Sequence, residues 1–193
     1  MSSSATPYGA RPVGTLSASG SFSGKVRHYS IASGYATSIF YGDFVKLVAA
    51  GGVEKDTGTT ACTPVGIFLG VSYTDPNTSQ KTFSQMWTAS TVASDASAYV
   101  MDDPDVLFEM QGDGTGAQTV IGNNVAVVQT AGSTTIGTSK NAIDISTVAS
   151  TTATLPIRIV DISSKSDNAA GDAYTDLVVK FNAGHIMRNT TGI

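Results

Sequence analysis

The stretch that decides the fold is PVGIFLGVSY at residues 64–73, followed by TDPN at 74–77 and KTFSQMW at 81–87. The first run is continuously apolar, contains two glycines and is too short for a helix, so it predicts a buried central strand with a bulge or a close backbone approach at the glycines. TDPN has the residue types of a tight turn. The third run alternates well enough for an antiparallel partner strand, so the three segments predict a hairpin.

Short runs rich in β-branched and aromatic residues lie on both sides of this hairpin, separated by glycine-rich turns. They occupy residues 38–41, 44–48, 106–111, 125–128, 155–162 and 175–181. In the run at 44–48, Val45 and Leu47 share a wholly apolar face with Ala49, which we expect to face the core. The best helical candidate is residues 90–100. The pattern predicts an all-β fold, a compact antiparallel β-barrel or sandwich with little helix.

The first 24 residues have a different composition from the rest of the chain. They hold many Ser, Gly and Ala and few large apolar residues, too few to offset the entropy lost on ordering. We therefore predict an extended N-terminal arm at residues 1–24, flexible or ordered only against a partner, and a single β-rich domain at residues 25–193.

Charge is scarce in this chain. Only 13% of residues are charged, about half of the roughly 25% usual in globular domains. A free monomer normally keeps a mixed-charge surface, so the scarcity predicts a surface covered by neighbouring subunits. The net charge of −4 makes whole-surface nucleic-acid binding unexpected. The single cysteine, Cys62, excludes an internal disulfide, and neither a signal peptide nor a membrane-spanning run is present.

Few residues could carry chemistry. The two histidines, His28 and His185, lie at opposite ends of the chain and outside any metal-ligand spacing. The segment DDPD at 102–105 resembles a solvated turn more than a calcium loop, although a structural cation there is the other interpretation. We expect no catalysis, no cofactor and no metal. An enzyme would instead need one of the histidines hydrogen-bonded to a carboxylate in a cleft.

The charges that are present are segregated along the chain. Three bases and no acid precede His28, whereas acids accumulate between Lys81 and Lys140 without any base. One interpretation is chance clustering; the other is that the arm docks on an acidic surface of a neighbouring subunit. The second interpretation makes these residues candidates for partner binding: Arg11, Lys25, Arg27, Asp102, Asp103 and Asp105.

Several segments, in the same order along the chain, resemble a group of tailed-bacteriophage virion proteins. They are residues 41–47, 64–75, 83–87, 103–108, 155–161 and 172–182. The likeness runs over most of residues 38–193 and leaves the arm outside it. None of these segments is a chemical motif, so the resemblance depends on their order.

The resemblance implies a capsid decoration (cement) protein that clamps neighbouring major-capsid subunits, as a homo-oligomer and most simply a trimer. Such a protein is made in the host bacterial cytoplasm and resides on the capsid exterior of the virion. It has no catalytic residues and no nucleic-acid or membrane partner. The alternative is a receptor- or carbohydrate-binding head fibre or tail component, which would need exposed aromatic residues such as Tyr35, Tyr73 or Trp87 lining a groove. A major capsid subunit would need a long spine helix, which the sequence does not predict.

Overall fold

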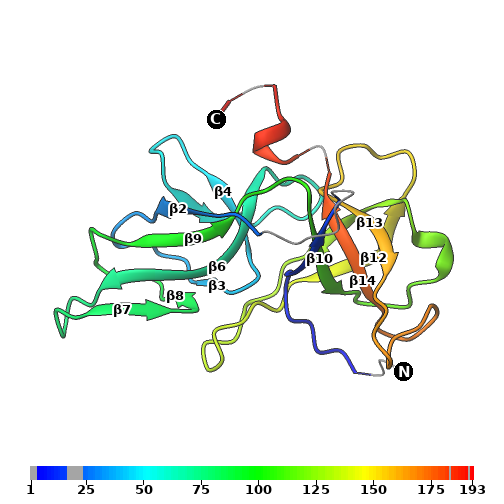
Figure 1. Cartoon of the computed structure of the whole chain (residues 1–193), viewed down its shortest axis with the longest axis horizontal. Coiled ribbons are helices and arrows are strands. Elements are labelled where there is room, and N and C mark those ends of the chain that lie inside the picture. Colours follow the sequence, from blue (N-terminus) through cyan, green and yellow to red (C-terminus); the bar gives the residue numbers. More distant parts are fainter. Residues whose placement is uncertain (1–3, 17–23, 183, 191) are drawn as a thin grey trace.

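Two antiparallel sheets lie in the two halves of the elongated molecule (Figure 1). The computed structural model describes residues 4–16, 24–182, 184–190 and 192–193. Within these residues the chain forms short strands and two single-turn 3₁₀ helices, η1 (Gln118–Val120) and η2 (Ile186–Arg188). The prediction of an all-β fold with little helix is confirmed. The architecture is a sandwich of sheets and not a closed barrel.

Sheet A is built from the middle of the predicted arm and the second half of the chain. Its strands, in spatial order, are β1 (Arg11–Thr15), β10 (Val106–Gln111), β14 (Asp176–Phe181), β13 (Ile157–Ile162), β11 (Asn124–Val128) and β12 (Ala142–Ala149). The sheet curls so far that Gly112, just after β10, bridges Ile143 in β12.

Sheet B is built from residues 26–101. Its strands, in spatial order, are β2 (Val26–Ser30), β9 (Ser97–Met101), β6 (Pro64–Thr74), β4 (Phe44–Leu47) and β5 (Val53–Lys55), with β7 (Lys81–Ser84) also paired to β6. A small two-stranded sheet of β3 (Ile39–Phe40) and β8 (Met86–Trp87) completes this half.

The hairpin predicted from residues 64–87 is present. Strand β6 pairs with β7 from Val71 opposite Ser84 to Thr74 opposite Lys81. The predicted roles of both glycines are confirmed. A Cβ on Gly66 would collide with the carbonyl oxygen of Met101 in β9, and the pairing of β6 with β9 shifts by one residue at Gly70.

The strand β4 differs from the prediction because both of its faces are buried. Phe44 belongs to the hydrophobic cluster inside sheet A, whereas Val45 belongs to the cluster inside sheet B. Ile67 and Met101 of sheet B also pack into the sheet A cluster. An alternating pattern identifies one apolar face, but it cannot show that a second layer covers the other face.

The helix considered at residues 90–100 is not formed. Ser97–Met101 is strand β9, an interior strand of sheet B between β2 and β6, and turns precede it. Ala98 and Val100 pack in the hydrophobic cluster of sheet B. Because the helix propensity of this segment is weak, pairing with the neighbouring strands β2 and β6 makes it a strand.

The prediction of a flexible arm does not fit residues 8–15. Residues 11–15 are strand β1, an edge strand paired antiparallel with β10. Just before it, Ala10 is fully buried and donates its N–H to Gly42 O at 3.0 Å, while Gly9 donates to Asn141 O at 3.2 Å. Small residues suit this crowded junction: Gly9 has φ +75° and lies against Ser139, where a side chain would not fit. Residues 1–3 and 17–23 of the predicted arm lie outside the described residues.

Candidate functional site

The structure brings two of the six predicted partner-binding residues together, within one chain. Arg27 Nε lies 3.2 Å from Asp102 Oδ2, and the Tyr29 hydroxyl donates to the same oxygen at 2.7 Å. Burial of the Tyr29 hydroxyl and its bond to Asp102 raise the pKa of Tyr29 to about 12. Asp102 is nearly fully buried, so it is a poor candidate for docking a neighbouring subunit.

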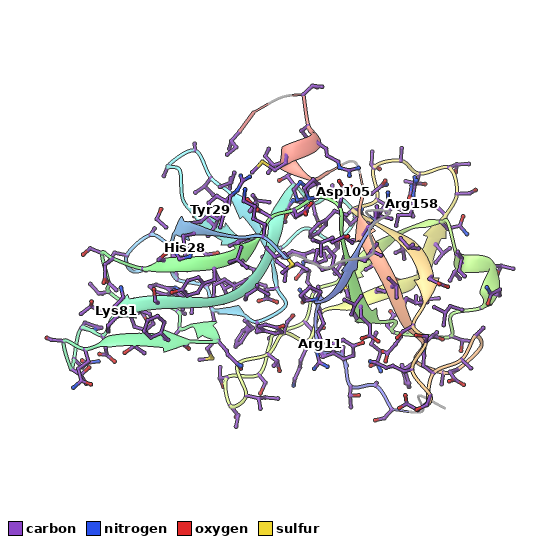
Figure 2. The ribbon with its side chains drawn as sticks, in the orientation of Figure 1. Arg11, His28, Tyr29, Lys81, Asp105 and Arg158 are labelled. Carbon is purple, nitrogen blue, oxygen red and sulfur yellow. The ribbon has the colours of Figure 1, made fainter. Side chains whose placement is uncertain are left out.

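The other four predicted residues do not form one site. Arg11 is opposite Glu109 at one end of the β1–β10 pair, whereas Asp105 lies just before β10, beyond the other end of the pair. Figure 2 shows the Arg11 and Asp105 side chains well separated. Asp105 forms an ion pair with Arg188 from η2, and Asp103 Oδ1 accepts the Asp105 N–H at 2.9 Å. Lys25 is exposed.

A partly buried charged cluster, which the sequence did not predict, ties Tyr8 to sheet A: Glu109 and Asp176 are buried, whereas Lys165 is partly exposed. Lys165 Nζ lies 2.7 Å from Glu109 Oε1 and 3.0 Å from Asp176 Oδ2. Two cations also make cation–π contacts with the Tyr8 ring: Lys165 Nζ lies 5.1 Å from the ring centre, and the Arg11 guanidinium carbon lies 4.1 Å from it.

The pKa shifts in this cluster argue against acid–base chemistry. Burial first, and then the charges of Asp176 and Glu109, raise the pKa of Tyr8 far above its usual value. For Lys165, burial alone lowers the pKa, but the hydrogen bonds to Glu109 and Asp176 outweigh it and the net shift is upward. Both groups therefore keep their protons at neutral pH, whereas a general acid or base needs a pKa near the working pH. The cluster instead joins the segment at Tyr8 to sheet A through ion pairs and cation–π contacts.

A second buried network joins the two halves of the molecule. Asp43 is fully buried. Its Oδ1 accepts from Ser139 Oγ at 2.7 Å and Asn141 Nδ2 at 3.2 Å, both in the half that contains sheet A. Its Oδ2 accepts the Phe40 N–H at 2.9 Å and lies 2.9 Å from Lys55 Nζ. Each carboxylate oxygen therefore has two partners, as a buried charge requires.

Neither histidine is hydrogen-bonded to a carboxylate in the described contacts. His185 Nδ1 accepts the Met187 N–H at 3.2 Å, and its Nε2 is buried without a partner. Burial, with help from the charge of Arg188, lowers the pKa of His185 to about 4. His28 lies on exposed β2, with its Nδ1 3.5 Å from Ser97 Oγ. Cys62 is buried, and burial raises the pKa of its thiol to about 12, so it remains an unreactive thiol.

The three aromatic residues that a sugar-binding groove would need, Tyr35, Tyr73 and Trp87, do not line one groove together. Trp87 is fully buried and donates Nε1–H to Tyr35 O at 3.3 Å. The Tyr35 hydroxyl accepts the Lys55 N–H at 3.1 Å. Tyr73 lines a hollow, a pocket of about 500 Å³ between the β6–β7 turn and residues 88–92.

Two large exposed apolar side chains line a second hollow. Phe83 on β7 is 72% exposed and Ile136 is 64% exposed. Both line a recess of about 370 Å³ between β7–β8 and the loop at residues 134–137, which comes from the sheet A half. Exposed apolar residues gathered in this way mark interaction surfaces more often than scattered ones do.

Within the described part of the chain, no group of three or more His, Cys, Asp or Glu side chains is arranged to hold a metal ion. None of the helices in those residues has the length and apolar character that a membrane crossing requires.

The sequence contained one signal for the buried clusters. Glu109 interrupts the otherwise apolar run VLFEM at 106–110, and a charge in a buried strand requires a partner. The partner could not be named, because Lys165 and Asp176 come from segments more than 50 residues away. No protein-family model, curated protein or solved structure matches this chain.

Proposed function

We propose that this chain is a structural virion protein that decorates a bacteriophage capsid and stabilises it by clamping neighbouring major-capsid subunits, without catalysis. It acts as a homo-oligomer, a trimer in the simplest case, on the exterior of the capsid. The observation that carries the proposal is the exposure of Phe83 and Ile136 together across one hollow, on a molecule with few charges. Burying two such side chains against a neighbour contributes about 1.5–3 kcal/mol each.

The charge pairing of the chain supports this proposal. Lysine and arginine side chains that are already paired within the chain include Arg27, Lys55, Lys81, Lys165 and Arg188. Many of the exposed residues that remain are Ser and Thr. Another subunit can cover the parts of this surface that lie away from exposed charges such as Lys25 and Lys140, because burying an unpaired charge is costly.

Strand edges provide a second kind of contact. Strand β12 ends sheet A and β2 ends sheet B in the described residues. Backbone groups at such edges can pair with an extended segment of a neighbour. Many modest contacts of this kind, repeated over a closed shell, give avidity without high affinity at any one of them.

The internal networks suit a clamp because they make the two halves one body. Asp43 bonds across the junction to Ser139 and Asn141, and β1 adds the N-terminal segment to sheet A. A protein that resists shell expansion or rupture has to transmit force between its contacts without opening. The hypothesis that the arm docks on an acidic surface of a neighbouring subunit loses two of its candidate residues, because Arg27 and Asp102 already pair within one chain.

The test is binding to undecorated shells of the phage that encodes the chain. We expect Phe83→Ser with Ile136→Ser to reduce shell occupancy at least about tenfold at a fixed protein concentration, because each substitution removes one apolar contact. Val92→Ser, at another side chain that is 65% exposed, is the matched control and should bind as the wild type does. Equal occupancy for the double variant and the control would contradict the proposal, provided that both variants melt at the wild-type temperature.

A further inference from the structure

We propose that the pocket beside Tyr73 is a binding site for a neutral saccharide, independent of any role on a capsid. The pocket has a volume of about 500 Å³, within the roughly 300–1,000 Å³ of small-molecule sites. It lies between the β6–β7 turn and residues 88–92, at the end of the molecule farthest from sheet A, where Figure 1 shows the β6–β7 hairpin at the tip.

One wall of the pocket is an aromatic ring that cannot move freely. Tyr73 packs edge to face on Trp87, with ring centroids 5.6 Å apart and planes at 75°. Trp87 is itself fully buried, so the Tyr73 ring is held in place before any ligand arrives. Pre-ordered aromatic rings give contact area at little entropic cost on binding, and the apolar face of a sugar ring fits such a wall.

The polar groups of the pocket are also held in place by their own loops. Asp75 Oδ1 accepts the N–H groups of Asn77 at 2.7 Å and Thr78 at 3.3 Å, which fixes the carboxylate at the rim. On the opposite side, the Thr91 hydroxyl donates to Thr88 O at 2.8 Å, and Ser90 donates its N–H to Tyr35 O at 2.8 Å.

Backbone strain is concentrated in the same two loops. Among the described residues, Ser79 (φ 57°) and Ser90 (φ 63°) are the non-glycine residues with positive φ. Ser79 lies in the β6–β7 turn and Ser90 lines the pocket. Conformations of this kind store backbone strain and gather at ligand-binding sites.

The lining chemistry selects the ligand class. The pocket presents one carboxylate, one side-chain amide and several hydroxyl groups, and no Lys, Arg or His is among the residues that line it. The nearby Lys81 is paired with Asp95 at 2.9 Å. An anionic ligand would therefore meet the uncompensated charge of Asp75. A neutral polyol donates hydroxyl groups to that carboxylate and accepts from the amide of Asn77 and the hydroxyls.

The experiment is a titration of the isotope-labelled full chain, followed by backbone NMR shifts, with the methyl glycosides of glucose, galactose, mannose and N-acetylglucosamine as probes. We expect at least one glycoside to shift residues 73–77 and 88–92 in a saturable way. Asp75→Asn keeps the acceptor of the turn but replaces a charge-assisted bond with a neutral one, so it should weaken binding about tenfold. Asp167→Asn, an exposed aspartate in the other half, is the matched control and should bind normally.

Three results would overturn this proposal. None of the four glycosides shifts these residues; Asp75→Asn binds as tightly as the control; or tetramethylammonium, which an aromatic ring with a carboxylate can also hold, binds there in preference to every glycoside. Shell binding is measured separately, so failure of the saccharide site leaves the capsid proposal standing, and the reverse is also true.

Discussion

At the scale of single residues, the polar groups that matter most are buried and satisfied within the chain. Asp43 has four partners drawn from both halves of the molecule. His185 is one of the exceptions, because its Nε2 is buried without a hydrogen-bond partner. We therefore expect Asp43 to stabilise the fold at neutral pH and His185 to lower its stability in acid.

Replacing Asp43 with Ala should lower the free energy of unfolding by about 3–5 kcal/mol, because Lys55 is left as an unpaired, largely buried charge and Ser139 loses its acceptor. Urea denaturation followed by fluorescence of Trp87 measures this change. Asp167→Ala, at an exposed aspartate, is the control and should change stability by less than about 0.5 kcal/mol. A loss for Asp43→Ala no larger than the control would show that the network does not join the two halves.

The stability of the protein should fall as pH drops from about 6.5 to about 4. The pKa of His185 is lowered to about 4 in the folded chain and returns to about 6.5 on unfolding. Above pH 6.5 the imidazole is neutral in both states and does not penalise folding. Between pH 6.5 and 4 it is protonated in the unfolded chain but not in the folded one, so the free energy of unfolding falls by up to about 3 kcal/mol. Unfolding free energies measured across this range provide the test.

The control for this pH dependence is His185→Asn, whose side-chain oxygen can still accept the Met187 N–H. This variant should show a flatter profile between pH 6.5 and 4 than the wild type. Identical slopes for the two proteins would mean that His185 does not titrate in this way.

At the scale of elements, the sequence predicted local structure well and missed what depends on a second layer. The hairpin at residues 64–87 was predictable because its turn and both of its strands are contiguous. β9 was mistaken for a helix, because Ser- and Ala-rich segments carry little pattern until neighbours on both sides pair with them. β1 was missed for the same reason: Arg11–Thr15 has almost no apolar pattern and is held by β10.

Deleting residues 1–15 should therefore destabilise the fold, by about 2–4 kcal/mol, through loss of the β1–β10 hydrogen bonds and the buried contacts of Tyr8 and Ala10. A freely flexible arm would instead leave stability unchanged. Hydrogen exchange of the β10 amides, together with the melting temperature, distinguishes the two. Unchanged protection of β10 in the truncated chain would contradict the pairing of β1.

At the scale of the whole molecule, the scarcity of charge was readable from composition, but its arrangement was not. The sequence separated a basic start from an acidic middle, and only folding shows that Arg27 meets Asp102 within one chain. The hollow between Phe83 and Ile136 could not be predicted either, because its two walls, residues 83–86 and 134–137, come from separate parts of the sequence. Surfaces made from both halves require the tertiary structure.

The most direct test of the capsid proposal is a cryo-EM reconstruction of the virion whose genome encodes this chain. We predict density on the exterior that fits this two-sheet body where neighbouring capsid subunits meet, with Phe83 and Ile136 covered by a partner. A shell without such density, or density in which both side chains face solvent, would contradict the proposal.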